Sequence, residues 1–144
     1  MFKRLLHTDD NLTSFIIRIT VALVMLPHGA QKLLGMFGGY GFKATMGYFT
    51  SQGTPSILAF LVIFTESIGS LLILFGFTTR IWAAMLTIIM LVAANIHSPN
   101  GFFMNWGGTQ AGEGFEYHLL VIGINIALII KGAGRWSVDR QLSK

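Results

Sequence analysis

A single carboxylate stands in the middle of a long apolar segment. Glu66 is the one charged residue between Ile57 and Phe75, and a helix of that length spans roughly the hydrocarbon thickness of a bilayer. A carboxylate at this depth costs on the order of 2–3 kcal/mol or more, so Glu66 must face protein or water rather than lipid. Gly69 and Ser70 follow on the same helical face and are small enough to let another helix approach. Glu66 therefore needs a partner from another helix, unless it is protonated.

Other titratable and polar side chains gather at the ends of the neighbouring apolar segments. By their positions they share one membrane depth near the extracytoplasmic face, with Glu66 lying deeper. We predict that they form a ligand-binding or proton-exchange site, and that its members are His28, Gln31, Lys32, Glu66, His97, Glu116 and His118. Interface hydrogen bonding is the alternative for the three histidines. No metal site is predicted, because metal or bis-histidine haem binding requires aligned ring nitrogens, for which the sequence carries no signal.

Arg18 is another charge inside an apolar segment. It lies about 9 Å along its helix from the cytoplasmic end. We predict an intramembrane ion pair between Arg18 and Glu66, which would offset the burial of both charges. Two alternatives stay open at this point: Arg18 extends to the interface, or Glu66 pairs with His28.

The segment 98–116 is rich in glycine and contains no basic residue. It carries three aromatic side chains, Phe102, Phe103 and Trp106. We predict that the segment folds back over the mouth of the helices and that these rings form a wall of the ligand pocket. The alternative is an aromatic belt or plug at the membrane interface.

The composition requires these groups to be positioned by membrane helices. Hydrophobic residues make up 53% of the 144 residues and charged residues only 11%, well below the roughly 25% of soluble domains. We predict one all-α domain over residues 1–144, an integral membrane four-helix bundle with spans at about 12–34, 57–75, 79–97 and 117–131. A short amphipathic helix is predicted between the first two spans, lying in the interface with Phe42, Met46 and Phe49 on one face.

The basic residues are best interpreted as determinants of topology rather than as a nucleic-acid site. Most of them flank the two termini and the turn near Arg80, whereas the opposite side has Lys32 and Lys43. The positive-inside rule then places both termini in the cytoplasm of a bacterial inner or plasma membrane. The N-terminal segment resembles a signal peptide but lacks a cleavage site, so we expect it to stay as the first span. With no cysteine, the chain forms no disulfide and supplies no thiolate ligand to an iron–sulfur cluster.

Several motifs in the sequence resemble those of the DoxX-like integral membrane proteins. They are HGAQKLLGMFGG at 28–39, ESIGSLLILFGFTTR at 66–80, NGFF at 100–103, FEYHLL at 115–120 and GAGRWSVD at 132–139. The resemblance covers nearly the whole chain and implies a four-helix membrane protein of bacteria or archaea. The family takes its name from subunits of a thiosulfate:quinone oxidoreductase, and some relatives associate with enzymes of oxidative and thiol stress. A role in quinone-linked redox chemistry is what this resemblance implies.

Three functions are compatible with these features. The first is a quinone-linked redox membrane protein, because an apolar pocket with a histidine and a carboxylate at its polar end suits a quinone ring. The second is a non-catalytic anchoring or assembly subunit of a membrane oxidoreductase complex, and the third is a small-solute or proton pathway. The expected partners are the lipid bilayer, a membrane or soluble oxidoreductase and further copies of the chain.

Overall fold

The computed structural model describes residues 2–144, and the regular elements in this range are helices. The all-α class predicted from the sequence is confirmed. In chain order the elements are α1 (Phe2–Leu6), α2 (Leu12–Leu34), α3 (Gly41–Ser51), α4 (Ser56–Phe64), the π-helical turn η1 (Thr65–Gly69), α5 (Ser70–Phe75), α6 (Thr79–His97), the short 3₁₀ turn η2 (Ser98–Asn100), α7 (Glu116–Lys131) and α8 (Val138–Ser143).

Three helical stretches are long and apolar enough to cross a membrane, namely Leu12–Leu34, Ser56–Phe75 and Thr79–Asn100. They correspond to the first three predicted spans, and α2 and α6 have the predicted bounds. The apolar helix α7 has 16 residues, about 24 Å, and packs along α6. The fourth span therefore stays a prediction, supported by this packing. The helix α3 is present where the amphipathic helix was predicted, and its place in the interface also stays a prediction.

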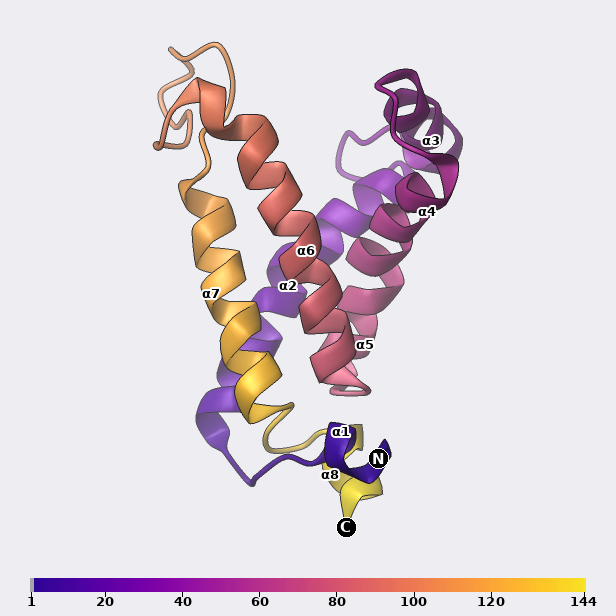
Figure 1. Cartoon of the computed structure of the whole chain (residues 1–144), viewed down its shortest axis with the longest axis vertical. Coiled ribbons are helices and arrows are strands. Elements are labelled where there is room, and N and C mark those ends of the chain that lie inside the picture. Colours follow the sequence, from indigo (N-terminus) through magenta and orange to yellow (C-terminus); the bar gives the residue numbers. More distant parts are fainter. Residues whose placement is uncertain (1) are drawn as a thin grey trace.

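The helices form two groups that meet at one end and separate toward the other (Figure 1). One group, the α6–α7 arm, consists of two long helices side by side. The other, the α2–α5 arm, contains α2 packed on η1 and α5, with α3 near its tip. Both termini lie at the end where the arms meet, which we call the base. This arrangement places the termini on one side, as predicted, while the identity of that side stays a prediction.

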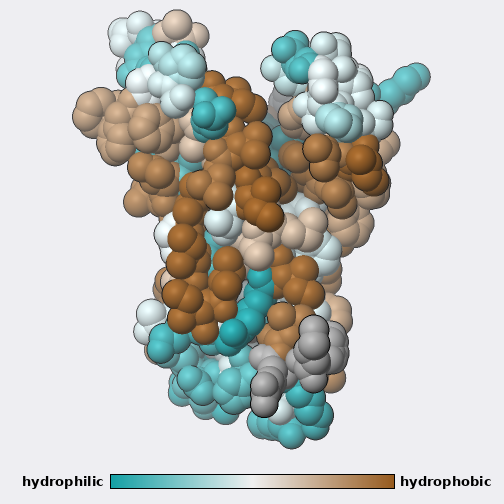
Figure 2. Space-filling model, in the orientation of Figure 1, coloured by the Kyte–Doolittle hydropathy of each residue, from teal (hydrophilic) through white to brown (hydrophobic). Residues whose placement is uncertain are grey.

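The apolar core lies where the two arms meet. Its buried members come from α2, α5, α6 and α7 and are Val21, Ala22, Met25, Ile73, Ala83, Leu86, Met90, Val121 and Leu128. Many other large apolar side chains are exposed on the outer faces of the helices, among them Leu23, Ile88 and Leu120. Figure 2 shows that apolar side chains dominate the middle of this face and that hydrophilic residues gather at both ends. This distribution is that of helices whose outer faces contact lipid.

Candidate functional site

Glu66 lies in the π-helical turn η1, within an otherwise α-helical segment. Turns of this kind are frequent at functional sites, because the additional residue per turn redirects the side chains. The backbone of α2 approaches this turn at Gly29, where a Cβ atom would overlap the carbonyl oxygen of Glu66. The prediction that Gly69 allows close approach is also confirmed, because the indole of Trp82 from α6 lies against it. Glu66 is thus held between helices and is buried.

The partner of Glu66 is Lys32. The Nζ atom of Lys32 lies 2.6 Å from Oε2 of Glu66, and their side chains are 25% and 6% exposed. Lys32 stands one helical turn beyond Gly29, so the close contact of α2 with η1 brings its ammonium group to the carboxylate. The predicted ion pair between Arg18 and Glu66 is therefore wrong. Arg18 precedes Lys32 by 14 residues, about 21 Å of helix, and lies near the base instead.

Arg18 is buried, with 1% of its surface exposed, and its guanidinium group binds backbone oxygens. Its Nη1 atom donates to the carbonyl of Leu74 at 2.9 Å, and Nη2 donates to those of Arg135 and Trp136 at 3.2 Å each. The turn at Gly76 makes room for it, because a Cβ atom at that glycine would overlap the guanidinium group. Arg18 thus joins three parts of the chain and has a structural role.

Four aromatic and imidazole rings connect α2 with the α6–α7 arm. The ring centroids of His28 and Tyr117 are 6.1 Å apart, those of Tyr117 and His118 are 5.5 Å apart, and those of His118 and His97 are 5.0 Å apart. The Tyr117 hydroxyl donates to the sulfur of Met25 at 3.5 Å. We call His28, Tyr117, His118 and His97 the ring row.

The ring row brings together the three histidines that the sequence placed at one depth, and it adds a residue that the prediction missed. Tyr117 was not counted as a site residue, although it stands between Glu116 and His118 at the start of α7. His118 is buried, and its Nδ1 atom has no hydrogen-bond partner among the described residues. Nδ1 of His118 can therefore bind a ligand or a proton. His28, at the other end of the ring row, is exposed.

Glu116 and Gln31, predicted as site members, bind backbone and loop groups instead. Oε1 of Glu116 accepts hydrogen bonds from the Met104 amide at 2.9 Å and from the Trp106 indole at 3.4 Å. The Gln31 side chain donates to the carbonyl of Phe37 at 3.1 Å, within the turn that follows α2. Neither contact joins the ring row or the Lys32–Glu66 pair. Glu116 orders the loop, and Gln31 orders the turn.

The three aromatic rings of the loop do not form the predicted pocket wall. Phe102, Phe103 and Trp106 are exposed, and Trp106 has 88% of its surface accessible. Phe102 packs edge-on against Phe103 and Phe115, within the loop itself. The wall prediction is corrected by these exposures, and the alternative of an aromatic belt agrees with them. The physical reason is that the loop is held by local contacts: Glu116 and Glu113 accept hydrogen bonds from the backbone amides of Met104 and Asn105.

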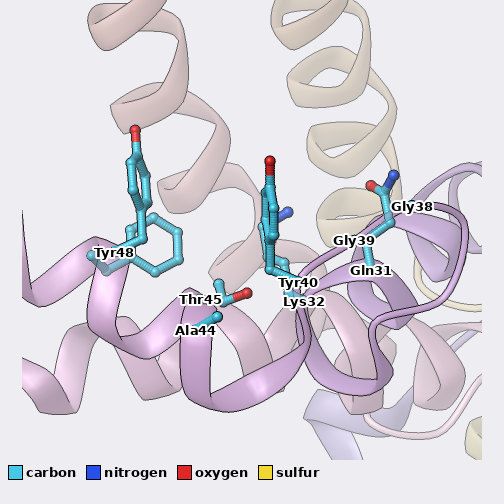
Figure 3. A pocket seen from close by; sticks show the side chains of 9 residues that line it. Gln31, Lys32, Gly38, Gly39, Tyr40, Ala44, Thr45 and Tyr48 are labelled. Atoms are coloured by element: carbon cyan, nitrogen blue, oxygen red, sulfur yellow. The ribbon is translucent and has the colours of Figure 1, made fainter.

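A groove of about 540 Å³ lies between the C-terminal part of α2 and α3 (Figure 3). The residues that line it are close together in the sequence and are Gln31, Lys32, Gly38, Gly39, Tyr40, Ala44, Thr45, Tyr48 and Phe49. Figure 3 shows that the side chains of Tyr40 and Tyr48 project to the same side of α3. Lys32 belongs both to this groove and to the ion pair with Glu66. The groove thus connects the surface with the buried charge pair.

Comparisons with known proteins agree with the motifs. Residues 13–99 match the family DoxX. Over 99% of this chain and 89% of its own length, "Uncharacterized membrane protein Rv3486" of Mycobacterium tuberculosis is 33% identical. "Inner membrane protein YqjF" of Escherichia coli is 32% identical over 88% of this chain and 89% of its length.

A further relative carries a functional name. "Putative oxidoreductase CatD" of Bacillus subtilis is 30% identical over 80% of this chain and 77% of its own length. No solved structure matches the chain. The family match, the near full-length relatives and the apolar helices together support the resemblance predicted from the motifs. The chain is a membrane protein that belongs to the DoxX family.

Proposed function

We propose that this protein takes part in quinone-linked electron transfer in the membrane, with the Lys32–Glu66 pair and the ring row as its ligand-binding and proton-exchanging groups. The observation that carries the proposal is a buried ion pair within an apolar segment, whose Lys32 stands one helical turn from His28 on α2. Ionisable groups at such positions are expensive and typically functional. The name of the relative CatD supports the oxidoreductase part of the proposal.

The residues present fit a quinone. Such a ring needs apolar surroundings and a few donors to its two carbonyl oxygens, and Lys32, Tyr117 and the imidazoles supply N–H and O–H donors between apolar helices. A quinone is a lipid-soluble carrier that takes up two electrons and two protons. The electrons would come from a reduced partner protein or a soluble reductant. Lys32 is the donor that can hold a carbonyl oxygen without losing its own proton.

The chain's own residues would move the protons. Glu66 orients the Lys32 ammonium group, because Nζ and Oε2 are 2.6 Å apart in a buried site. The side chains of the ring row, from His97 to His28, can each exchange a proton. Nδ1 of His118, which has no hydrogen-bond partner among the described residues, is one of the exchanging atoms. The row thus leads from the α6–α7 arm toward the charge pair on the α2–α5 arm.

The experiment is to purify the protein in mild detergent and to measure the quinone that stays bound after extraction and chromatography. We expect the purified protein to retain up to one quinone molecule per chain. His28→Ala and Glu66→Gln should each lower this amount roughly tenfold. The matched control is His7→Ala, because His7 is an exposed histidine whose carbonyl binds Arg80 and which lies outside the proposed site. Equal retention in all four proteins would contradict the site. Absence of quinone, together with a stoichiometric membrane partner, would favour the anchoring function.

A further inference from the structure

The groove between α2 and α3 has the composition of a site for a flat ring. Its walls include the phenol rings of Tyr40 and Tyr48, which are 87% and 63% exposed, and the ring of Phe49. Two glycines, Gly38 and Gly39, keep its edge low, and a Cβ atom at Gly38 would meet open space. Exposed aromatic rings that project to one side of a helix offer stacking surfaces that the fold itself does not use.

One positive charge belongs to this groove. The Lys32 ammonium group has three N–H donors, and the bond to Glu66 uses one of them. Its side chain is a quarter exposed, so a second acceptor can reach it from the groove while Glu66 stays bound. A carbonyl oxygen is an acceptor of this kind, because it needs a donor but brings no second charge that would compete with the carboxylate.

We propose that this groove is where the quinone ring binds, stacked against Tyr40 and Tyr48, with one carbonyl oxygen accepting a hydrogen bond from Nζ of Lys32. The inference rests on the proposed function and narrows it: the ligand binds on the α2–α5 arm through Lys32, and the ring row keeps the proton-exchanging role. The groove volume falls within the range of small-molecule sites. The edge-on contact of Phe42 in α3 with Phe60 in α4 continues the aromatic surface toward an apolar helix, along which a lipid-soluble ligand would arrive.

The direct test is photolabelling of the membrane-reconstituted protein with a short-chain quinone that carries an aryl azide. After irradiation and proteolysis, mass spectrometry locates the label. We expect it on the segment 40–49, and competition by unmodified quinone should remove it. Label on α6 or α7 would overturn the groove as the site while leaving the proposed function in place. If no segment is labelled, the proposed function fails together with the groove.

Three substitutions on α3, one of them a control, test the groove without touching the charge pair. Ala44→Trp fills the groove, because Ala44 lines it, and we expect at least tenfold weaker quinone binding by fluorescence quenching. Lys43→Trp adds the same bulk at the neighbouring exposed position, which does not belong to the lining, and should bind as the unchanged protein does. Tyr48→Leu should weaken binding roughly three- to tenfold. Equal binding by the two tryptophan variants would refute the groove.

Discussion

The base of the molecule and its open end use buried polar groups in opposite ways. At the base, Arg18 donates to three backbone carbonyls, and both carboxylate oxygens of Asp139 accept amide hydrogens, from Thr78 at 2.6 Å and Thr79 at 2.9 Å. Ser137 likewise donates to Gly134 and accepts from Arg140. These groups connect the tail, the α5–α6 turn and α2, so the base behaves as a closed structural unit.

At the opposite end, where the two arms separate, the polar groups make fewer hydrogen bonds, and more of them are ionisable side chains. Lys32 and Glu66 bind each other, and the rings of His118 and His97 stack without a hydrogen bond to Nδ1 of His118. Thr65, beside Glu66, also has a buried hydroxyl without a partner among the described residues. The difference teaches that charge inside a membrane segment does not by itself identify a functional residue. What distinguishes the two regions is what the charged groups bind: Arg18 and Asp139 bind backbone groups of separate segments, whereas Lys32 and Glu66 bind each other.

The largest effect is expected for Arg18→Met. The substitution leaves the carbonyls of Leu74, Arg135 and Trp136 without their donor in a buried place, so we expect the free energy of unfolding to fall by about 3 kcal/mol or more. Denaturant unfolding in detergent, followed by tryptophan fluorescence, measures it. Arg80→Met is the control, because Arg80 donates only to the His7 carbonyl among the contacts described and should lose less than about 1 kcal/mol. Similar losses in both variants would contradict the structural role assigned to Arg18.

Gly29→Ala should have the next largest effect. The added methyl group overlaps the backbone of Glu66 and Ser67, so α2 and η1 must separate, at about 1–3 kcal/mol. Since the same contact brings Lys32 to Glu66, quinone binding should fall as well. Gly123→Ala is the matched control, because a Cβ atom there meets nothing within 4 Å, and a neutral or slightly stabilising change is expected. Unfolding and binding measured on both proteins decide the matter.

Substitutions in the Lys32–Glu66 pair should affect stability and quinone binding differently. Lys32→Met leaves a buried carboxylate without its cation and should destabilise the protein by about 2 kcal/mol. Adding Glu66→Gln to that variant removes the isolated charge, so we expect stability to recover while quinone binding stays lost. The double variant is therefore the informative one. Recovery of both properties would show that the pair has only a structural role, like Arg18.

The smallest effect concerns a surface contact of the base. Asp10 accepts from Arg135 at 2.8 Å and pairs with Arg140 at 2.9 Å, and the hydrogen bond from Arg135 is the main cause of its lowered pKa. Because the pKa in the folded state lies below the ordinary 3.8, the stabilisation is present above that pH and is lost as the pH falls through the folded value. Melting of the protein and of Asp10→Asn should therefore differ slightly near neutral pH and converge in acid. A difference that grows in acid would contradict the assignment.

The sequence by itself determined the helices and the burial of Glu66. The predicted bounds of α2 hold because Asn11 caps its first turn and Gly35 ends it in a left-handed conformation, and both signals are local. The burial of Glu66 followed from its apolar surroundings. Family membership followed from motifs along the chain. These motifs could be recognised in the sequence because they include the glycines at which helices and turns come into contact.

Only the tertiary structure decided which charges meet. The sequence favoured Arg18 as the partner of Glu66, whereas the contact at Gly29 determines the relative register of α2 and η1 and brings Lys32 there instead. The same holds for Glu116, whose carboxylate binds the loop backbone that folds beside it. Helix propensity and hydropathy act over neighbouring residues, while the pairing of side chains depends on how closely and in what register two helices pack. That distance and register arise from the assembled bundle.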